Sequence, residues 1–297
     1  METLQKAGIE LILLLQSYQS PLLDSFFNFI TQFGGFAYVL IIPVIIWCIE
    51  PRLGLRALLA MMISQYIVML LKDIVAEPRP FLADSRIISD GEHGLSFPSG
   101  HAMGSFVFYG MLLMSTQKNW LKYSLAALIF LIGVSRSYLG VHYPHDVVAG
   151  WLLAVGFLAL WSRIENGVLQ PLAKKSLVIQ CSLVFTIPTA VAVAHLYIFD
   201  YFGALVVAAA VSVTALALMA EYNHPSSNAE GGLLQKAGRY VLGVALTMAV
   251  LTAFRQFYPS EEAAAYNLVV WLNGAAIAAM IVFVAPWIFK KVGLSAS

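Results

Sequence analysis

The chain contains 297 residues, of which 60% are hydrophobic and 11% are charged, and its mean hydropathy is +0.80. These values exclude an ordinary soluble protein and indicate an integral membrane protein. The formal net charge of +1, without a run of like charges, gives no reason to expect nucleic-acid binding. Cys48 and Cys181 lie in apolar segments without metal-ligand spacing, so we expect them to be packed rather than to form a disulfide or a zinc site.

The first 33 residues contain no segment long enough to cross a membrane. Residues 8–15 are apolar with interspersed polar side chains, which predicts a helix lying in the membrane interface. Lys6 precedes this stretch and no small-residue cleavage site follows it, so a removable signal peptide is not expected. Residues 21–33 fit either a second interfacial helix or an extension of the first span.

Nine apolar segments then approach the length needed to cross about 30 Å of hydrocarbon. They cover residues 34–49, 54–76, 101–117, 121–139, 145–162, 176–197, 201–220, 237–258 and 264–289. Because backbone polar groups must be paired within each segment in lipid, they predict an all-α polytopic helix bundle rather than a barrel. We expect interfacial helices over residues 1–33, a core with five spans over 34–163, and an extension with four spans over 164–297.

Basic residues are concentrated in alternate loops of this layout. They are Arg52, Arg56, Lys118, Lys122, Arg163, Lys174, Lys175, Lys236, Arg239, Lys290 and Lys291. The face that carries them is expected to be cytoplasmic. The opposite, extracytoplasmic face then holds the loop 77–100 and the turn 140–144.

The first polar cluster is KDIVAEPRP, at the end of the second expected span. Lys72 and Arg79 are seven residues apart, about two helical turns, so both should project to one side as Pro78 and Pro80 end the helix. A lysine within a membrane span is costly and points to function. The alternative is a snorkelling lysine beside an ordinary interfacial arginine.

The second cluster is SFPSGHAMG, where a third span begins. Ser99 is expected to cap the helix, Gly100 allows close backbone approach, and the free N–H groups of the first turn form an anion site. His101 stands beside that site and titrates near neutral pH, which suits proton transfer to a leaving group. The alternative is a capped helix start with an incidental histidine.

The third cluster is SRSYLGVHYPHD. Arg136 ends the fourth span, and Asp146 falls in the first turn of the next helix, where it could hold the ring of His142. His145 is a rival partner by sequence, but directly before Asp146 in a helix it is expected to point elsewhere. The alternative is a polar helix cap with interfacial histidines.

Taken together, the three clusters place cations, a helix N-terminus and two histidines on one side of the membrane. Three cations and free N–H groups describe a phosphate cradle. One histidine could then attack phosphorus or activate water while the other protonates the departing oxygen. The acidic residues of the loop lack ligand spacing, so metal-independent phosphoryl transfer without a cofactor is expected.

The three clusters resemble, complete and in order, the signature motifs of the type 2 phosphatidic acid phosphatase superfamily. The matching patterns are Lys72-x6-Arg79-Pro80, Pro98-Ser99-Gly100-His101 and Ser135-Arg136-x5-His142-x3-Asp146. The resemblance covers about residues 20–163 and implies that His142 is the nucleophile that forms a phosphohistidine, Asp146 its orienter and His101 the general acid. It further implies that the phosphoryl oxygens are bound by Lys72, Arg79, Ser99, Gly100 and Arg136.

The resemblance implies a membrane phosphatase that hydrolyses a lipid phosphate or lipid diphosphate, of the phosphatidic acid or undecaprenyl diphosphate type, at the extracytoplasmic face. The nine-span layout and the stretches GHAMG and YLGVHYPHDVVAG also resemble glucose-6-phosphatase, and the layout resembles the sphingosine phosphate phosphatases. A phosphosugar phosphatase and a lipid-to-lipid phosphotransferase therefore stay open as alternatives. A transporter is disfavoured because transporter sites lie near the bilayer midplane on broken helices.

Overall fold

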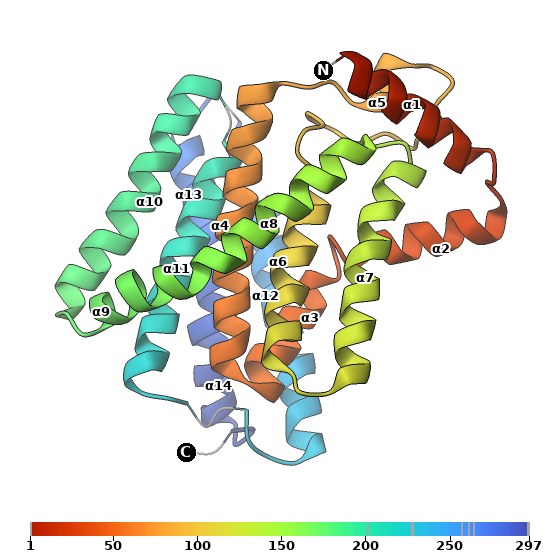
Figure 1. Ribbon diagram of the computed structural model, residues 1–297. Helices are drawn as coiled ribbons and strands as arrows, with labels where there is room; N and C mark the ends of the chain where they lie inside the picture. Colours follow the sequence, from red (N-terminus) through yellow and green to blue (C-terminus); the bar gives the residue numbers. More distant parts are fainter. Residues whose placement is uncertain are drawn as a thin grey trace. The chain divides into compact units, whose positions relative to one another are not determined.

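The computed structural model describes residues 2–200, 202–226, 229–256, 258–260, 262–263 and 265–295, and helices are the one kind of regular secondary structure among them (Figure 1). It divides into two compact units. Unit 1 comprises Met1–Tyr38 and Ser64–Leu160, and unit 2 comprises Val39–Ile63 and Trp161–Ser297. The all-α expectation is confirmed for the described chain.

Unit 1 contains all three polar clusters of the sequence. Its helices are α1 (Glu2–Gln16), α2 (Pro21–Gln32), the end of α4 (Pro51–Val75), the short α5 (Pro80–Ala83), α6 (Gly100–Ser115), α7 (Asn119–Tyr138) and most of α8 (Pro144–Ile164). Residues 21–32 form a separate helix, which favours the first of the two alternatives for this stretch. Pro21 begins it, and Ser20 caps it by accepting a hydrogen bond from Leu23 N.

Helix α1 packs on the turn that leads into α8. Ile12 and Tyr143 are fully buried and form a small apolar core with Ile87. The side-chain amide of Gln16 donates to the carbonyl of Ile88 at 2.7 Å and accepts from its N–H at 3.0 Å. These contacts fix one end of the long α5–α6 loop against α1.

Unit 2 holds the remaining helices. They are α3 (Tyr38–Val44), η1 (Ile45–Ile49), α9 (Gln170–Ala173), α10 (Leu177–Phe199), α11 (Gly203–Asn223), α12 (Leu233–Gln256), α13 (Tyr266–Ala279), η3 (Met280–Val284) and α14 (Ala285–Lys291), with η2 (Glu165–Leu169) between α8 and α9. Helix α11 packs against both α10 and α13 and is the most buried of the six candidate spans. Within this unit Arg56 forms an ion pair with the buried Glu165 at 2.7 Å.

Six helices of the described chain are long and apolar enough to cross a membrane. They are Pro51–Ala83, Pro144–Ala173, Leu177–Phe199, Gly203–Asn223, Leu233–Phe254 and Tyr266–Lys291. The expectation of nine spans is therefore confirmed for six segments and not for the segments 34–49, 101–117 and 121–139.

The other three segments are shorter or more polar than expected. The first forms an apolar helix over only Tyr38–Ile49. Helix α6 has 16 residues, about 24 Å at the usual rise. Helix α7 has 20 residues, but Lys122 and Arg136 lower its hydropathy near the ends.

Candidate active site

The turn between α7 and α8 brings His142 against Asp146. Gly140 adopts a φ of 69°, which a glycine accommodates without strain, and α8 begins at Pro144. Asp146 then lies in the first turn of α8, where its Oδ2 atom is 3.1 Å from Nδ1 of His142. The predicted contact between these two residues is present, and both side chains are buried.

The carboxylate of Asp146 is held by two further donors. The hydroxyl of Ser96 donates to Oδ2 at 2.5 Å, and the backbone N–H of Tyr143 donates to the same atom at 2.9 Å. Ser96 was not among the expected site residues, because no local pattern distinguishes it from any other loop serine. Together these bonds fix the carboxylate on the Nδ1 side of the His142 ring.

His142 is held in its neutral form. Burial, followed by the nearby cations Arg136, Lys72 and Arg79, holds the pKa of His142 well below its usual range. Because Nδ1 faces a carboxylate, the single ring proton belongs on Nδ1 and the lone pair lies on Nε2. The arrangement suits attack through Nε2.

Arg79 connects the loop, the α7–α8 turn and His142. Its side chain is 3% exposed. It donates to the carbonyls of Gly94 and His93 at 3.0 Å each and to that of Val141 at 2.8 Å. Its Nη1 atom also lies 3.3 Å from Nε2 of His142, so the guanidinium borders the atom with the free lone pair.

Lys72 reaches the same region from the end of α4. Its Nζ atom donates to the carbonyl oxygen of Ser96 at 3.0 Å and also contacts that of Leu95. Helix α4 ends at Val75, and Ala76 adopts a φ of 52° that turns the chain toward Pro78. Lys72 and Arg79 thus face the same loop, but Arg79 lies beyond the end of α4 in extended backbone, so the expected two helical turns between them are not formed.

Arg136 and Arg79 converge on one carboxylate, that of Glu92. Arg136 donates to the hydroxyl of Thr31 at 2.6 Å and contacts Oε2 of Glu92, while Arg79 lies 3.3 Å from Oε1. Two guanidinium groups on the two oxygens of one anion are the arrangement that a phosphate group favours. The Glu92 side chain, one-third exposed, therefore stands where a substrate phosphate would be expected.

The start of α6 lies beside Asp146. Ser99 is the N-cap, as predicted: its hydroxyl accepts from Ala102 N at 3.4 Å, and its own N–H donates to the carbonyl of Asp146 at 3.1 Å. Gly100 opens the helix, and its carbonyl accepts from the amide of Gln65 at 3.1 Å. The free N–H groups of this first turn are thereby fixed next to the His142 turn.

His101 packs against the connection between α2 and α3. A Cβ atom on Gly35 would lie 3.0 Å from Nε2 of His101, and one on Gly34 would lie 3.0 Å from its Cδ2. Among the described residues the imidazole has no hydrogen-bond partner. A ring held by packing alone can exchange a proton with a ligand or water through the nitrogen atom that carries the lone pair.

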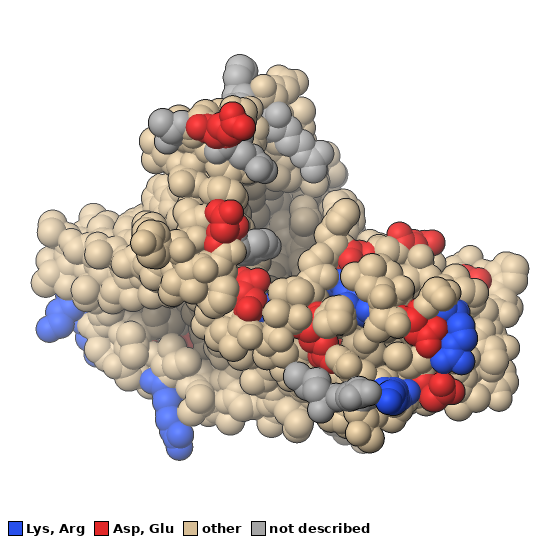
Figure 2. Space-filling view, turned by 90° about the horizontal axis from the view of Figure 1, so that it is seen from above, with Lys and Arg blue, Asp and Glu red and all other residues tan. Residues whose placement is uncertain are grey.

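A cavity of about 290 Å³ borders the cradle. Its lining includes Asp24, Asn28, Thr31, Asp90, Glu92 and Arg136. This end of the protein carries acidic and basic groups intermingled (Figure 2). The cavity therefore gives a polar route to Arg136 and to the Glu92 carboxylate that contacts it.

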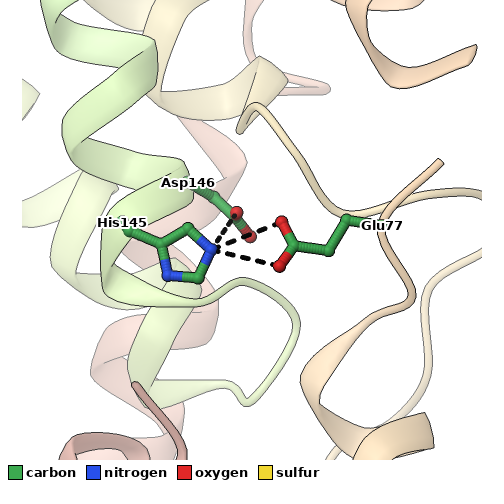
Figure 3. Close-up of side chains that lie close together, drawn as sticks. All are labelled: Glu77, His145 and Asp146. Carbon is green, nitrogen blue, oxygen red and sulfur yellow. Dashed lines mark hydrogen bonds and ion pairs between the residues drawn. The ribbon is translucent and has the colours of Figure 1, made fainter. Parts of the chain in front are cut away.

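His145 does not point away from Asp146, and the expectation that it would is wrong. Its Nε2 atom lies 3.4 Å from Oδ1 of Asp146 and 3.2 Å from Oε1 of Glu77 (Figure 3). The physical reason is that a histidine in the first turn of a helix can reach around the helix start toward a partner on another segment. In the described chain, Glu77, His145 and Asp146 are the one group whose ligand atoms lie close enough, within 4.8 Å, to hold a metal ion.

The comparisons with known proteins place the site within a known family. A model of the PAP2 superfamily matches residues 53–168, and a model described as the transmembrane extension of PAP2 superfamily phosphatases matches residues 205–297. The first match contains every predicted site residue from Lys72 to Asp146.

Two curated proteins and one solved structure are similar to this chain. Lipid phosphate phosphatase delta of Arabidopsis thaliana is 28% identical over 54% of this chain, which spans only 42% of the plant protein. The undecaprenyl-diphosphatase of Sulfolobus acidocaldarius is 30% identical over 54% of this chain and 79% of its own length. The crystal structure of Aquifex aeolicus LpxE is 28% identical, covers 52% of this chain and 93% of its own, and gives a TM-score of 0.48. On the family models and the archaeal relative, this chain belongs to the PAP2 superfamily of membrane phosphatases.

Proposed function

We propose that the protein hydrolyses a lipid phosphate or lipid diphosphate through a phosphohistidine on His142. The observation that carries the proposal is the neutral, carboxylate-bound ring of His142 beside two arginines that converge on one anion. The names of the relatives support lipid monophosphates and prenyl diphosphates as the substrate class.

The first step forms the phosphoenzyme. Nε2 of His142 attacks phosphorus, a P–N bond forms, and the P–O bond to the leaving group breaks. His101 gives a proton to the departing oxygen. Burial and the cations Arg136, Arg79 and Lys72 hold the pKa of His101 well below its usual range, so it takes up this proton when the negative charge of the phosphate lies beside it. Arg79, Arg136 and Lys72, with the N–H groups of α6 at Ser99 and Gly100, bind the other phosphoryl oxygens and stabilise their charge.

The second step releases phosphate. Neutral His101 takes a proton from water as the water oxygen attacks phosphorus, and the P–N bond breaks. The products are inorganic phosphate, the neutral Nδ1–H form of His142 and a reprotonated His101. Asp146 accepts the Nδ1–H bond throughout, which keeps Nε2 the reactive atom.

The proposal places this chemistry in residues 34–163, with the remainder of the chain, 164–297, adjusting substrate preference. The alternation of basic loops supports an extracytoplasmic position for the site and a cytoplasmic position for Arg52, Arg56 and the other loop cations. In a bacterial cell the protein would lie in the inner membrane, with membrane lipids around it.

A substrate panel tests the proposal. Phosphate release is measured for purified protein from phosphatidic acid, undecaprenyl diphosphate and glucose 6-phosphate, in EDTA. We expect turnover of a lipid substrate, and loss of at least about 10³-fold in kcat for His142→Ala. Radiolabelled substrate should leave an acid-labile, alkali-stable phosphoenzyme on the wild type only.

Three results would count against it. Unchanged activity in His142→Ala would show that the reaction does not pass through a phosphohistidine on this residue. Turnover of glucose 6-phosphate alone would replace the lipid substrate by a phosphosugar, and transfer of label to an added lipid alcohol instead of water would identify a phosphotransferase.

A further inference from the structure

A second polar pair lies behind the His142–Asp146 pair. Asp146 contacts His142 through Oδ2, whereas its Oδ1 atom faces Nε2 of His145 at 3.4 Å. The same Nε2 lies 3.2 and 3.3 Å from the two carboxylate oxygens of Glu77. One imidazole nitrogen thus lies between two carboxylates, as Figure 3 shows, and a proton on it would face both.

Both carboxylates are buried, so a donor between them reduces the cost of keeping them charged. Asp146 is fully buried and Glu77 is 3% exposed. Oδ1 of Asp146 has no hydrogen bond among the described residues. The contact with Nε2 of His145 therefore supplies the favourable charge interaction for this oxygen atom. Two buried carboxylates without a donor between them repel and lose hydration, which favours protonation or rotation of one of them.

Two aromatic rings packed against His145 fix the orientation of its imidazole. The ring of Tyr143 stacks on it with the centroids 5.0 Å apart and the planes 13° from parallel. The ring of Phe97 lies on it less closely, at 6.3 Å. Nε2 is therefore held toward the carboxylates by packing that does not depend on a ligand.

Glu77 is fixed by residues from two other segments. Gln5 of α1 donates its side-chain amide to Oε1 at 2.8 Å, and the N–H of Ser96 donates to the carbonyl oxygen of Glu77 at 2.8 Å. The hydroxyl of this same Ser96 donates to Asp146. A shift of Glu77 would therefore be transmitted to Asp146 through both His145 and Ser96.

We propose that His145 and Glu77 are positioning residues that hold the Asp146 carboxylate ionised and turned toward His142. This inference rests on the proposed function of His142. The Nε2–H group of His145 faces Oδ1 of the carboxylate and offsets its charge, Glu77 holds His145, and Oδ2 stays aligned with Nδ1–H of His142. Neither residue contacts the phosphate, so their loss should reduce the rate of the chemical step and leave substrate binding intact.

The test compares His145→Ala, His145→Gln and Glu77→Gln with wild type, on the panel substrate that wild type turns over fastest. His145→Ala should lower kcat about 10- to 100-fold with KM changed less than about twofold. His145→Gln should recover part of the loss, because its amide N–H can replace Nε2–H. The double variant Glu77→Gln/His145→Ala should be no slower than His145→Ala alone, since both act through one contact.

Controls separate this inference from the proposed function and from misfolding. His224→Gln, in unit 2, is the matched histidine control and should keep wild-type kcat. Thermal unfolding of each variant checks the fold. If His145→Ala does not fold, the inference is tested by kcat of His145→Gln and Glu77→Gln, which should be partly reduced relative to wild type.

Three outcomes would overturn the inference. Wild-type kcat in His145→Ala and Glu77→Gln, with His142→Ala inactive, would refute it and leave the proposed function standing. A rise in KM at unchanged kcat would make His145 a binding group. A loss of wild-type activity in EDTA to the level of His145→Ala, restored by zinc, would mean that Glu77, His145 and Asp146 hold a metal rather than a proton. Activity in His142→Ala would instead refute the proposed function.

Discussion

The Nη1 atom of Arg79 lies 3.3 Å from Nε2 of His142, the atom proposed to attack phosphorus. The same guanidinium is fixed by three loop carbonyls, so its position does not depend on a ligand. A phosphate bound by Arg79 would consequently lie next to the free lone pair.

Arg79→Lys should therefore fail to replace arginine despite keeping the charge. A lysine lacks the planar fork that reaches Gly94, His93 and Val141 at once. We expect kcat/KM to fall by about 100-fold, measured as phosphate release with the lipid substrate. Arg86→Lys, an exposed arginine paired with Asp84, is the matched control and should change little. Equal activity of wild type and Arg79→Lys would contradict the role of the fork.

Glu92→Gln should improve phosphate binding. The carboxylate of Glu92 contacts both Arg79 and Arg136, so a substrate phosphate must displace it. Removal of its charge should lower KM and the inhibition constant of inorganic phosphate about 3- to 10-fold, with kcat unchanged. Asp90→Asn, on the same loop, is the control. Weaker phosphate inhibition in Glu92→Gln would show that Glu92 supports the cradle instead of occupying it.

The activity should persist at pH values low enough to protonate a histidine of ordinary pKa. Because the pKa of His142 is lowered by burial and by the cations around it, the neutral nucleophile survives below pH of about 6.5, the usual histidine value. The acid limb of kcat/KM should lie below that pH in wild type. It should move to higher pH in Arg136→Gln, because a cation that disfavours imidazolium is removed. The same substrate is used for both profiles, and an unmoved limb would mean that His142 does not set it.

Gly35→Ala should displace the proposed general acid. A Cβ atom there would lie 3.0 Å from Nε2 of His101, with no other group so close. We expect a fall of about 10-fold in kcat for a lipid phosphate, whose leaving alcohol needs a proton. Little change is expected for p-nitrophenyl phosphate, whose leaving group departs without one. Gly156→Ala, with no atom within 4 Å of the added Cβ, is the control. Equal losses on both substrates would argue against an acid role for His101.

The local features of the site were predictable because they depend on neighbours in the chain. The N-cap at Ser99, the turn at Gly140, and the contact of His142 with Asp146 four residues later all follow from short-range geometry. The catalytic roles of these residues stay predictions until the variants are measured. The spans were predictable where long apolar runs exist, and not where the helix is short, as over Tyr38–Ile49 and in α6, or carries charged residues near its ends, as in α7.

By itself, the sequence determined the membrane class, the helical architecture and the residue types of the three clusters, since apolar run length and local spacing decide these. Tertiary structure alone decided which groups meet across the chain. Ser96 reaches Asp146 over 50 residues, Glu92 reaches Arg136 over 44, and Glu77 reaches His145 over 68. Such contacts depend on how the helices pack and the loops fold over them, and no local periodicity encodes that.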